Sequence, residues 1–139
     1  MNKKMIVITL VLTLWLCVPA FSEPIVVVNN GVSVSSLDAG SLQKIYLGKK
    51  AKWDNGDVIA PVALKDGAVH DAFLKTFVKK SSSQFSSYWK KMIFTGQGVP
   101  PTSVSSEKDV VSFVSSTPGG IGYIDSQTPH DDVKAVPVH

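Results

Sequence analysis

Residues 61–80 combine an apolar run, a polar glycine turn and a helical repeat, an order that suits anion binding. The apolar run ends at Leu64, and after the turn apolar positions recur at helical spacing, at Val69, Ala72, Phe73, Thr76 and Phe77. A strand that enters a helix through such a turn leaves backbone N–H groups unpaired at the positive end of the helix dipole, where anions bind. The sequence therefore predicts an anion site at Lys65, Asp66, Gly67, Ala68, Val69 and His70.

Other residue groups with chemical potential favour structural roles. His70 and Asp71 are neighbours on the predicted helix and point about 100° apart, so a solvated pair is expected rather than an acid–base pair. The serines at 81–83 and 115–116 have no base placed to activate them, so we do not expect an enzyme. Gly119, Gly120 and Gly122 precede a strand, which favours a tight turn over a phosphate cradle.

Acidic and imidazole side chains near the C-terminus raise the question of a metal site. They lie in a predicted loop and tail without recognised ligand spacing, so we predict no metal and no cofactor; they are His130, Asp131, Asp132 and His139. The lysine clusters at 49–52, 79–80 and 90–91 are typical of solvated helix ends, although together they would also form a basic face.

The first 22 residues have the pattern of a secretory signal peptide. Lys3 and Lys4 precede 14 apolar residues at positions 5–18, and Ala20 and Ser22 are the small residues that a signal peptidase reads before Glu23. The apolar run is shorter than the roughly 20 residues that a membrane-spanning helix needs. We therefore expect residues 23–139 to form one domain in the periplasm.

Charge and cysteine content narrow the class of protein further. All 14 basic residues are lysines, and without Lys3 and Lys4 there are 12 lysines against 11 acidic residues, so nucleic acid is not an expected partner. Without arginine, no guanidinium can bind phosphate or carboxylate in a bidentate manner. Cys17 lies in the predicted signal peptide, so the exported form has no disulfide and must be held together by its core.

Strand and helix patterns alternate along the rest of the chain, which predicts an α/β domain with a small sheet covered by helices. We predict strands at 25–28, 59–64, 121–124 and 134–138, and a helix capped by Ser36 or Asp38 that buries Leu42, Ile45, Tyr46 and Leu47. Further helices are predicted at 84–92 and 106–115, with a loop at 95–101 between them. Trp53 is expected to be a packing anchor under a turn-rich loop.

Four phrases taken together resemble the bacterial periplasmic phosphate-binding proteins that feed ABC transporters. They are YLGKKAKWDNGDVIAPV, AFLKTF, YWKKMIFTGQGVPP and VVSFVSSTPGGIGYID, and the resemblance runs from about residue 25 to residue 125. It implies one lobe of a periplasmic-binding-protein-like fold, because the family has two lobes that close on the ligand. The family's matching lobe carries an Arg before a Ser-Gly-Thr at a helix start. Here Leu64 or Lys65 stands near the Arg, and Ala68 and Val69 near the Ser-Gly-Thr.

Two functional hypotheses follow from this comparison of residues. The first is an exported protein of the phosphate-type solute-binding class that reversibly binds phosphate or a similar oxyanion, linked to transport or sensing, with a second copy in place of the missing lobe. The second is a ligand-free interaction module for a membrane transporter, porin or sensor. The loss of the guanidinium and of both hydroxyls favours the second, and the retained Gly67 and helix start favour the first.

Overall fold

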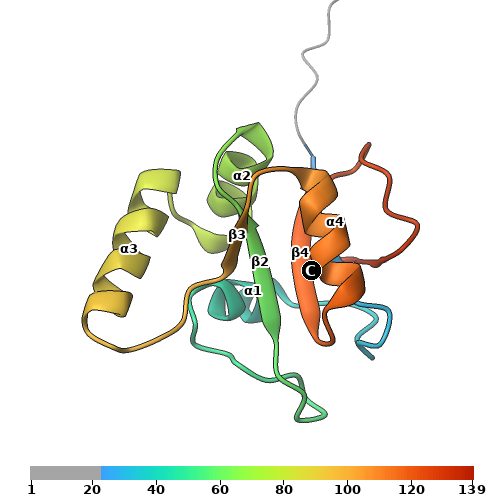
Figure 1. Ribbon diagram of the computed structural model, residues 1–139, viewed down its shortest axis with the longest axis horizontal. Coiled ribbons are helices and arrows are strands. Elements are labelled where there is room, and N and C mark those ends of the chain that lie inside the picture. Colours follow the sequence, from blue (N-terminus) through green and yellow to red (C-terminus); the bar gives the residue numbers. More distant parts are fainter. Residues whose placement is uncertain (1–22) are drawn as a thin grey trace, which may run out of the picture.

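The computed structural model describes residues 23–139 (Figure 1). The signal peptide prediction and Cys17 lie outside the described residues. The elements in chain order are β1 (Pro24–Val28), α1 (Ala39–Tyr46), β2 (Ala60–Leu64), α2 (Ala68–Phe73), the π-helix η1 (Leu74–Val78), α3 (Ser82–Phe94), β3 (Thr102–Val104), α4 (Glu107–Ser116), β4 (Gly120–Asp125) and β5 (Lys134–Val136). The α/β class predicted from the sequence is confirmed.

The five strands form one mixed sheet in the order β3-β2-β4-β1-β5. The central strand β4 pairs parallel with β2 and antiparallel with β1, with Val26 opposite Tyr123. At the edge, β3 pairs parallel with β2, and the sequence pattern predicted no strand at these three residues. Strand β2 therefore has a parallel neighbour on each side. Parallel strands are buried, so the chain that follows β2 packs over the sheet as a helix.

Helices cover both faces of the sheet, and Figure 1 shows α4 in front of it with α1 and α2 behind. On the α4 side, Gly122 leaves room for Val62, Val110 and Val114, whose atoms would lie within about 3 Å of any Cβ there. On the other side, the Tyr123 ring stacks on Phe73 with 3.8 Å between ring centroids. The buried core runs from Val26 to Val136, so residues 23–139 have a hydrophobic core of their own.

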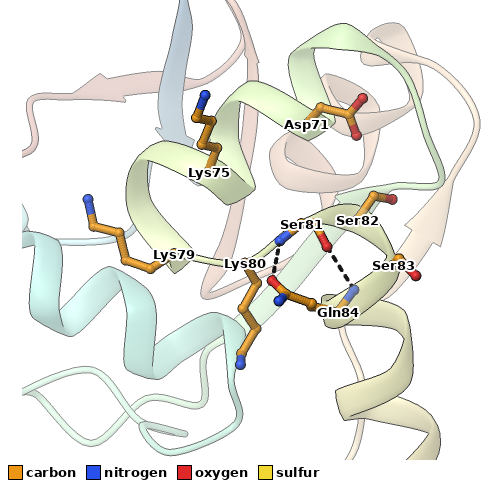
Figure 2. A pocket seen from close by; sticks show the side chains of 8 residues that line it. All are labelled: Asp71, Lys75, Lys79, Lys80, Ser81, Ser82, Ser83 and Gln84. Carbon is orange, nitrogen blue, oxygen red and sulfur yellow. Dashed lines mark hydrogen bonds between the residues drawn. The ribbon is translucent and has the colours of Figure 1, made fainter.

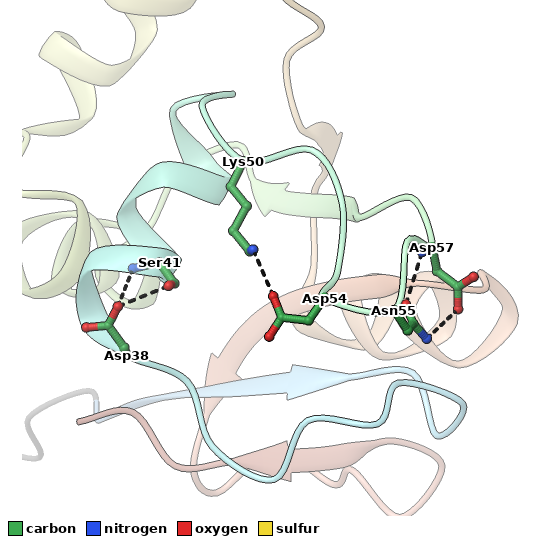
Figure 3. Close-up of polar contacts among 6 residues, drawn as sticks. All are labelled: Asp38, Ser41, Lys50, Asp54, Asn55 and Asp57. Atoms are coloured by element: carbon green, nitrogen blue, oxygen red, sulfur yellow. Dashed lines mark hydrogen bonds and ion pairs between the residues drawn. The ribbon is translucent and has the colours of Figure 1, made fainter.

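Local signals explain where α1 begins and how the following loop is held. Asp38 is the N-cap of α1, and its carboxylate accepts hydrogen bonds from the Gly40 amide and from the Ser41 amide, the second of which is drawn in Figure 3. In the loop after α1, an ion pair of 3.3 Å joins Lys50 to Asp54. Trp53 is buried beneath this loop and donates from Nε1 to the Gly119 carbonyl, which confirms its role as a packing anchor.

The helix after β2 is present, but the predicted buried face was wrong in detail. His70, Phe73, Leu74 and Val78 are buried, whereas Thr76 is exposed. The helix widens into the π-helix η1 at Leu74, where the Lys79 amide reaches back five residues to the Leu74 carbonyl. The buried positions still follow the 3.6-residue period, but they are offset by one residue from the predicted ones, beginning at His70 instead of Val69.

The helix α3 stands apart from the other helices, beyond the β3 edge of the sheet (Figure 1). It starts with a capping box in which Ser81 Oγ accepts from the Gln84 amide while Gln84 Oε1 accepts from the Ser81 amide. Two aromatic side chains, Phe85 and Trp89, are buried and attach it to the domain. No helix among residues 23–139 has the length and apolar character needed to cross a bilayer.

Candidate functional site

The six predicted site residues lie together where β2 passes into α2. Lys65, Asp66, Gly67 and Ala68 are exposed, Val69 is half-buried and His70 is buried. Gly67 has φ of 104° and nothing within 4 Å of an ideal Cβ, so it turns the chain in the left-handed region over open solvent. The turn is anchored on one side by the Lys65 amide, which donates to the Val104 carbonyl of β3.

The start of α2 differs from the starts of the other described α-helices. Asp38, Ser81 and Ser106 cap α1, α3 and α4 with side-chain oxygens, whereas the N-cap of α2 is Gly67 and provides none. Within residues 23–139, no intrachain acceptor pairs with the amides of Ala68, Val69 or His70, and the first paired amide is that of Asp71. These amides point to solvent or to a ligand, as expected at an open helix start.

The side chain of His70 faces the core and not the solvent. It is 2% exposed, and its Nδ1 lies 2.5 Å from the hydroxyl oxygen of Tyr123. That oxygen also accepts a hydrogen bond of 3.0 Å from the Leu64 amide, so the Tyr123 hydroxyl joins the end of β2 to His70 inside the core. The expected solvated pair of His70 and Asp71 is therefore wrong for His70, although Asp71 is exposed.

Burial also decides the charge of this histidine. Burial lowers the pKa of His70, while the carboxylates of Asp71 and Asp66 act in the opposite direction. Burial likewise raises the pKa of Tyr123. His70 is therefore neutral at pH 7 and gives an anion no positive charge, which leaves Lys65 as the cation of the predicted set.

Sequence reasoning missed the groove that adjoins this turn. It has a volume of about 300 Å³ and lies between α3 and the ends of β2 and β3. Lys65 and His70 lie at the β2 end of the groove, and its other lining residues include Ser82, Ser86, Trp89, Lys90 and Ser103. The serines of α3 were visible in the sequence, but no neighbouring residues indicate that they would lie opposite β2.

A larger open cavity, of about 710 Å³, lies between η1 and the first turn of α3. Figure 2 shows that Lys75, Lys79 and Lys80 point in different directions around it. The hydrogen bonds of the capping box already occupy the Ser81 and Gln84 side chains there. These cations do not converge on one point, so this cavity is a weaker candidate for an anion site than the open start of α2.

The structure does not assemble the candidate metal ligands. Across residues 23–139, no three His, Cys, Asp or Glu side chains gather closely enough to hold a metal ion. His130 Nδ1 lies 2.7 Å from the Thr128 carbonyl, a contact within its own loop. The glycine turn before β4 places Gly119 at φ of 75°, where its carbonyl accepts from Trp53 Nε1, so this turn is a packing feature.

Comparison with known proteins identifies the architecture. The sequence matches no protein-family model and no curated protein. Among solved structures, the chain is similar to a phosphate ABC transporter substrate-binding protein of Clostridium perfringens, solved with bound phosphate. The two sequences are 22% identical, and the structures superpose with a TM-score of 0.67. The alignment covers 84% of this chain and 45% of that one. The chain has the fold of one lobe of such a protein.

Two further structures agree with this assignment of a single lobe. PstS from Borrelia burgdorferi is 15% identical with a TM-score of 0.66, and the alignment covers 85% of this chain and 47% of that one. An ABC-type phosphate transport receptor from Vibrio cholerae is 19% identical with a TM-score of 0.58, covering 84% and 46%. The chain spans less than half the length of these substrate-binding proteins, and the recognition made from the sequence is confirmed at the level of the fold.

Proposed function

We propose that this chain is an exported, non-enzymatic protein of the periplasm that reversibly binds phosphate or a similar oxyanion at the start of α2. The observation that supports this most directly is the open helix start, because the amides of Ala68, Val69 and His70 have no intrachain acceptor. Unpaired amides at the positive end of a helical segment stabilise an anion. Lys65 adds a flexible cation, and a second copy or a membrane transporter would complete the site.

The same residues set the expected affinity low. The exposed carboxylate of Asp66 repels an anion, and neither Ala68 nor Val69 offers the hydroxyls of the phosphate-binding lobe. A charge-assisted hydrogen bond contributes about 1.5–3 kcal/mol, so a site without the guanidinium and both hydroxyls is several powers of ten weaker. We therefore expect a dissociation constant of about 1 mM, which corresponds to about 4 kcal/mol.

Nuclear magnetic resonance of residues 23–139 tests the location as well as the affinity. Titration with phosphate, sulfate or molybdate at constant ionic strength should shift the amide signals of Gly67, Ala68, Val69 and His70 in a saturable manner. Ala68→Asp, which places a carboxylate at the helix start, should abolish these shifts, and Asp66→Asn should strengthen binding. Lys65→Ala should weaken binding. Lys49→Ala, at an exposed lysine outside the turn, is its matched control and should leave binding unchanged. Shifts confined to the first turn of α3, or none at about 10 mM, would refute the proposal.

A second function is favoured by the side chains that are missing from the site. A lobe that keeps its fold but has a neutral, buried His70 and an exposed Asp66 at the ligand end suits an interaction module for a membrane transporter, porin or sensor. Capture of a specific membrane protein that persists with both Lys65→Ala and Ala68→Asp would support this function. Loss of that capture in step with loss of anion binding would support the first.

A further inference from the structure

The outer end of α3 exposes an unusual group of apolar side chains. Ile93 is 55% exposed, Phe94 91% and Val99 86%, and within residues 23–139 the other large apolar residue this exposed is Val58, at 65%. The three lie on the last turn of α3 and the loop after it, and we call them the α3 tip. Three large apolar side chains exposed to water at the end of a helix and in the loop after it cost solubility unless another surface covers them.

The chain around the α3 tip is basic and contains no acid. Residues 72–106 carry five lysines and neither Asp nor Glu, whereas the rest of residues 23–139 carries seven lysines and eleven acids. The five are Lys75, Lys79, Lys80, Lys90 and Lys91. Positive charge is therefore concentrated on η1 and α3, although the domain as a whole is close to neutral.

Lys91 and Phe94 share one side of α3. Gln84, Ser87, Lys91 and Phe94 follow one another at spacings of three, four and three, so they lie on one face of the helix, and all four are exposed. Together with Lys79 and Lys80, Ser87 and Lys91 also line an open cavity of about 490 Å³. The outward face of α3 thus combines small hydroxyls, cations and a terminal Phe.

We propose that this face of α3 docks on an anionic lipid bilayer, with the α3 tip inserted among the headgroups and the lysines against lipid phosphates. A few inserted apolar side chains together with diffuse positive charge are enough for interfacial binding. A stable protein partner needs about 800 Å² of fitted surface on each side, with a continuous apolar centre. Here Phe85 and Trp89 of α3 are buried in the domain and Tyr88 is half-buried, which leaves Phe94 on a protruding tip rather than a fitted patch.

Vesicle binding by residues 23–139 tests this directly. The probe is large unilamellar vesicles of 30% phosphatidylglycerol and 70% phosphatidylcholine, compared with pure phosphatidylcholine, by co-sedimentation at low salt. A lysine near an anionic surface contributes about fivefold to binding, so Lys90→Gln with Lys91→Gln should weaken it by about tenfold or more. Phe94→Ser should weaken it by a similar factor. Val58→Ser and the pair Lys49→Gln with Lys52→Gln are matched controls that should leave binding unchanged, because these exposed residues lie outside α3.

A fluorescent label reports on insertion itself. Residues 23–139 contain no cysteine, so Gln97→Cys and Val58→Cys each provide a single labelling site for an environment-sensitive dye such as NBD. Anionic vesicles should shift the emission to the blue at position 97 but not at position 58, and about 0.5 M NaCl should reverse the shift as charges are screened. Equal shifts at both positions, binding insensitive to the α3 variants, or no binding would overturn the proposal. So would a concentration-dependent dimer in light scattering that Phe94→Ser abolishes, because the tip would then be a contact between copies.

Discussion

Replacing Tyr123 by Phe should destabilise the domain far more than the loss of one surface hydroxyl. The Tyr123 oxygen accepts from the Leu64 amide at 3.0 Å and pairs with His70 Nδ1 at 2.5 Å, and all three groups are buried. Tyr123→Phe keeps the ring that stacks on Phe73 and removes only this oxygen. The change leaves the Leu64 amide on β2 and His70 Nδ1 on α2 buried without partners.

The magnitude follows from these two unsatisfied groups. A buried polar group left without a partner costs about 1–3 kcal/mol, so we expect a loss of about 2–4 kcal/mol in the free energy of unfolding. This is a large share of the roughly 5–15 kcal/mol that holds a domain together. Urea unfolding followed by tryptophan fluorescence should show the midpoint falling by about 2 M, for a slope of about 1.5 kcal/mol per M.

Removal of a different tyrosine hydroxyl and a second substitution at His70 test whether the effect comes from this buried hydrogen-bond pair. Tyr88→Phe deletes the hydroxyl that donates to the Leu47 carbonyl at 2.6 Å in a partly buried setting, and it should cost less than about 1 kcal/mol. In the Tyr123→Phe background, His70→Leu should cost less than it does alone, because one unpaired polar group is removed. A midpoint shift below about 0.5 M, or additive costs for the two substitutions, would refute the reasoning.

Two further predictions concern pH and backbone strain. Burial lowers the pKa of His70, so the unfolded chain binds more protons, and stability should fall as the pH drops below about 6.5 towards the folded-state pKa. The urea midpoints measured at pH 7.5 and at pH 5.0 should therefore differ less for His70→Gln than for the wild type. An unchanged difference would contradict this. Gly119→Ala, with φ of 75° and a Cβ 2.1 Å from the Val58 carbonyl oxygen, should cost about 3 kcal/mol or more. Gly56→Ala, with φ of 91° and nothing within 4 Å of its Cβ, should cost about 1 kcal/mol, and equal losses in thermal melts would contradict the argument.

The parts of the fold that sequence analysis predicted well depend on neighbouring residues. The start of α1 at Asp38 follows from one side chain that reaches amides two and three residues ahead. The start of α4 follows from Ser106, whose Oγ accepts from the Asp109 amide three residues ahead. Such signals are complete within one helical turn, so they can be identified without knowledge of the rest of the chain.

The features that sequence analysis missed depend on distant residues. The burial of His70 is decided by Tyr123, which lies 53 positions away and only meets it once β2 and β4 have paired. Strand β3 is three residues long, and its backbone is ordered by pairing with β2 rather than by a local pattern. The widening at η1 depends on a bond over five residues, which a 3.6-residue period does not reveal.

The two proposed binding surfaces can be separated by experiment even though both would contact phosphate groups. The open amides at Ala68, Val69 and His70 belong to α2, whereas Phe94 lies at the far end of α3, a helix of 13 residues and about 20 Å. If lipid phosphates bound at the start of α2, Ala68→Asp would release the protein from anionic vesicles, and Lys91→Gln would not. We expect the reverse, because α3 lies within the acid-free segment 72–106 and carries exposed apolar side chains.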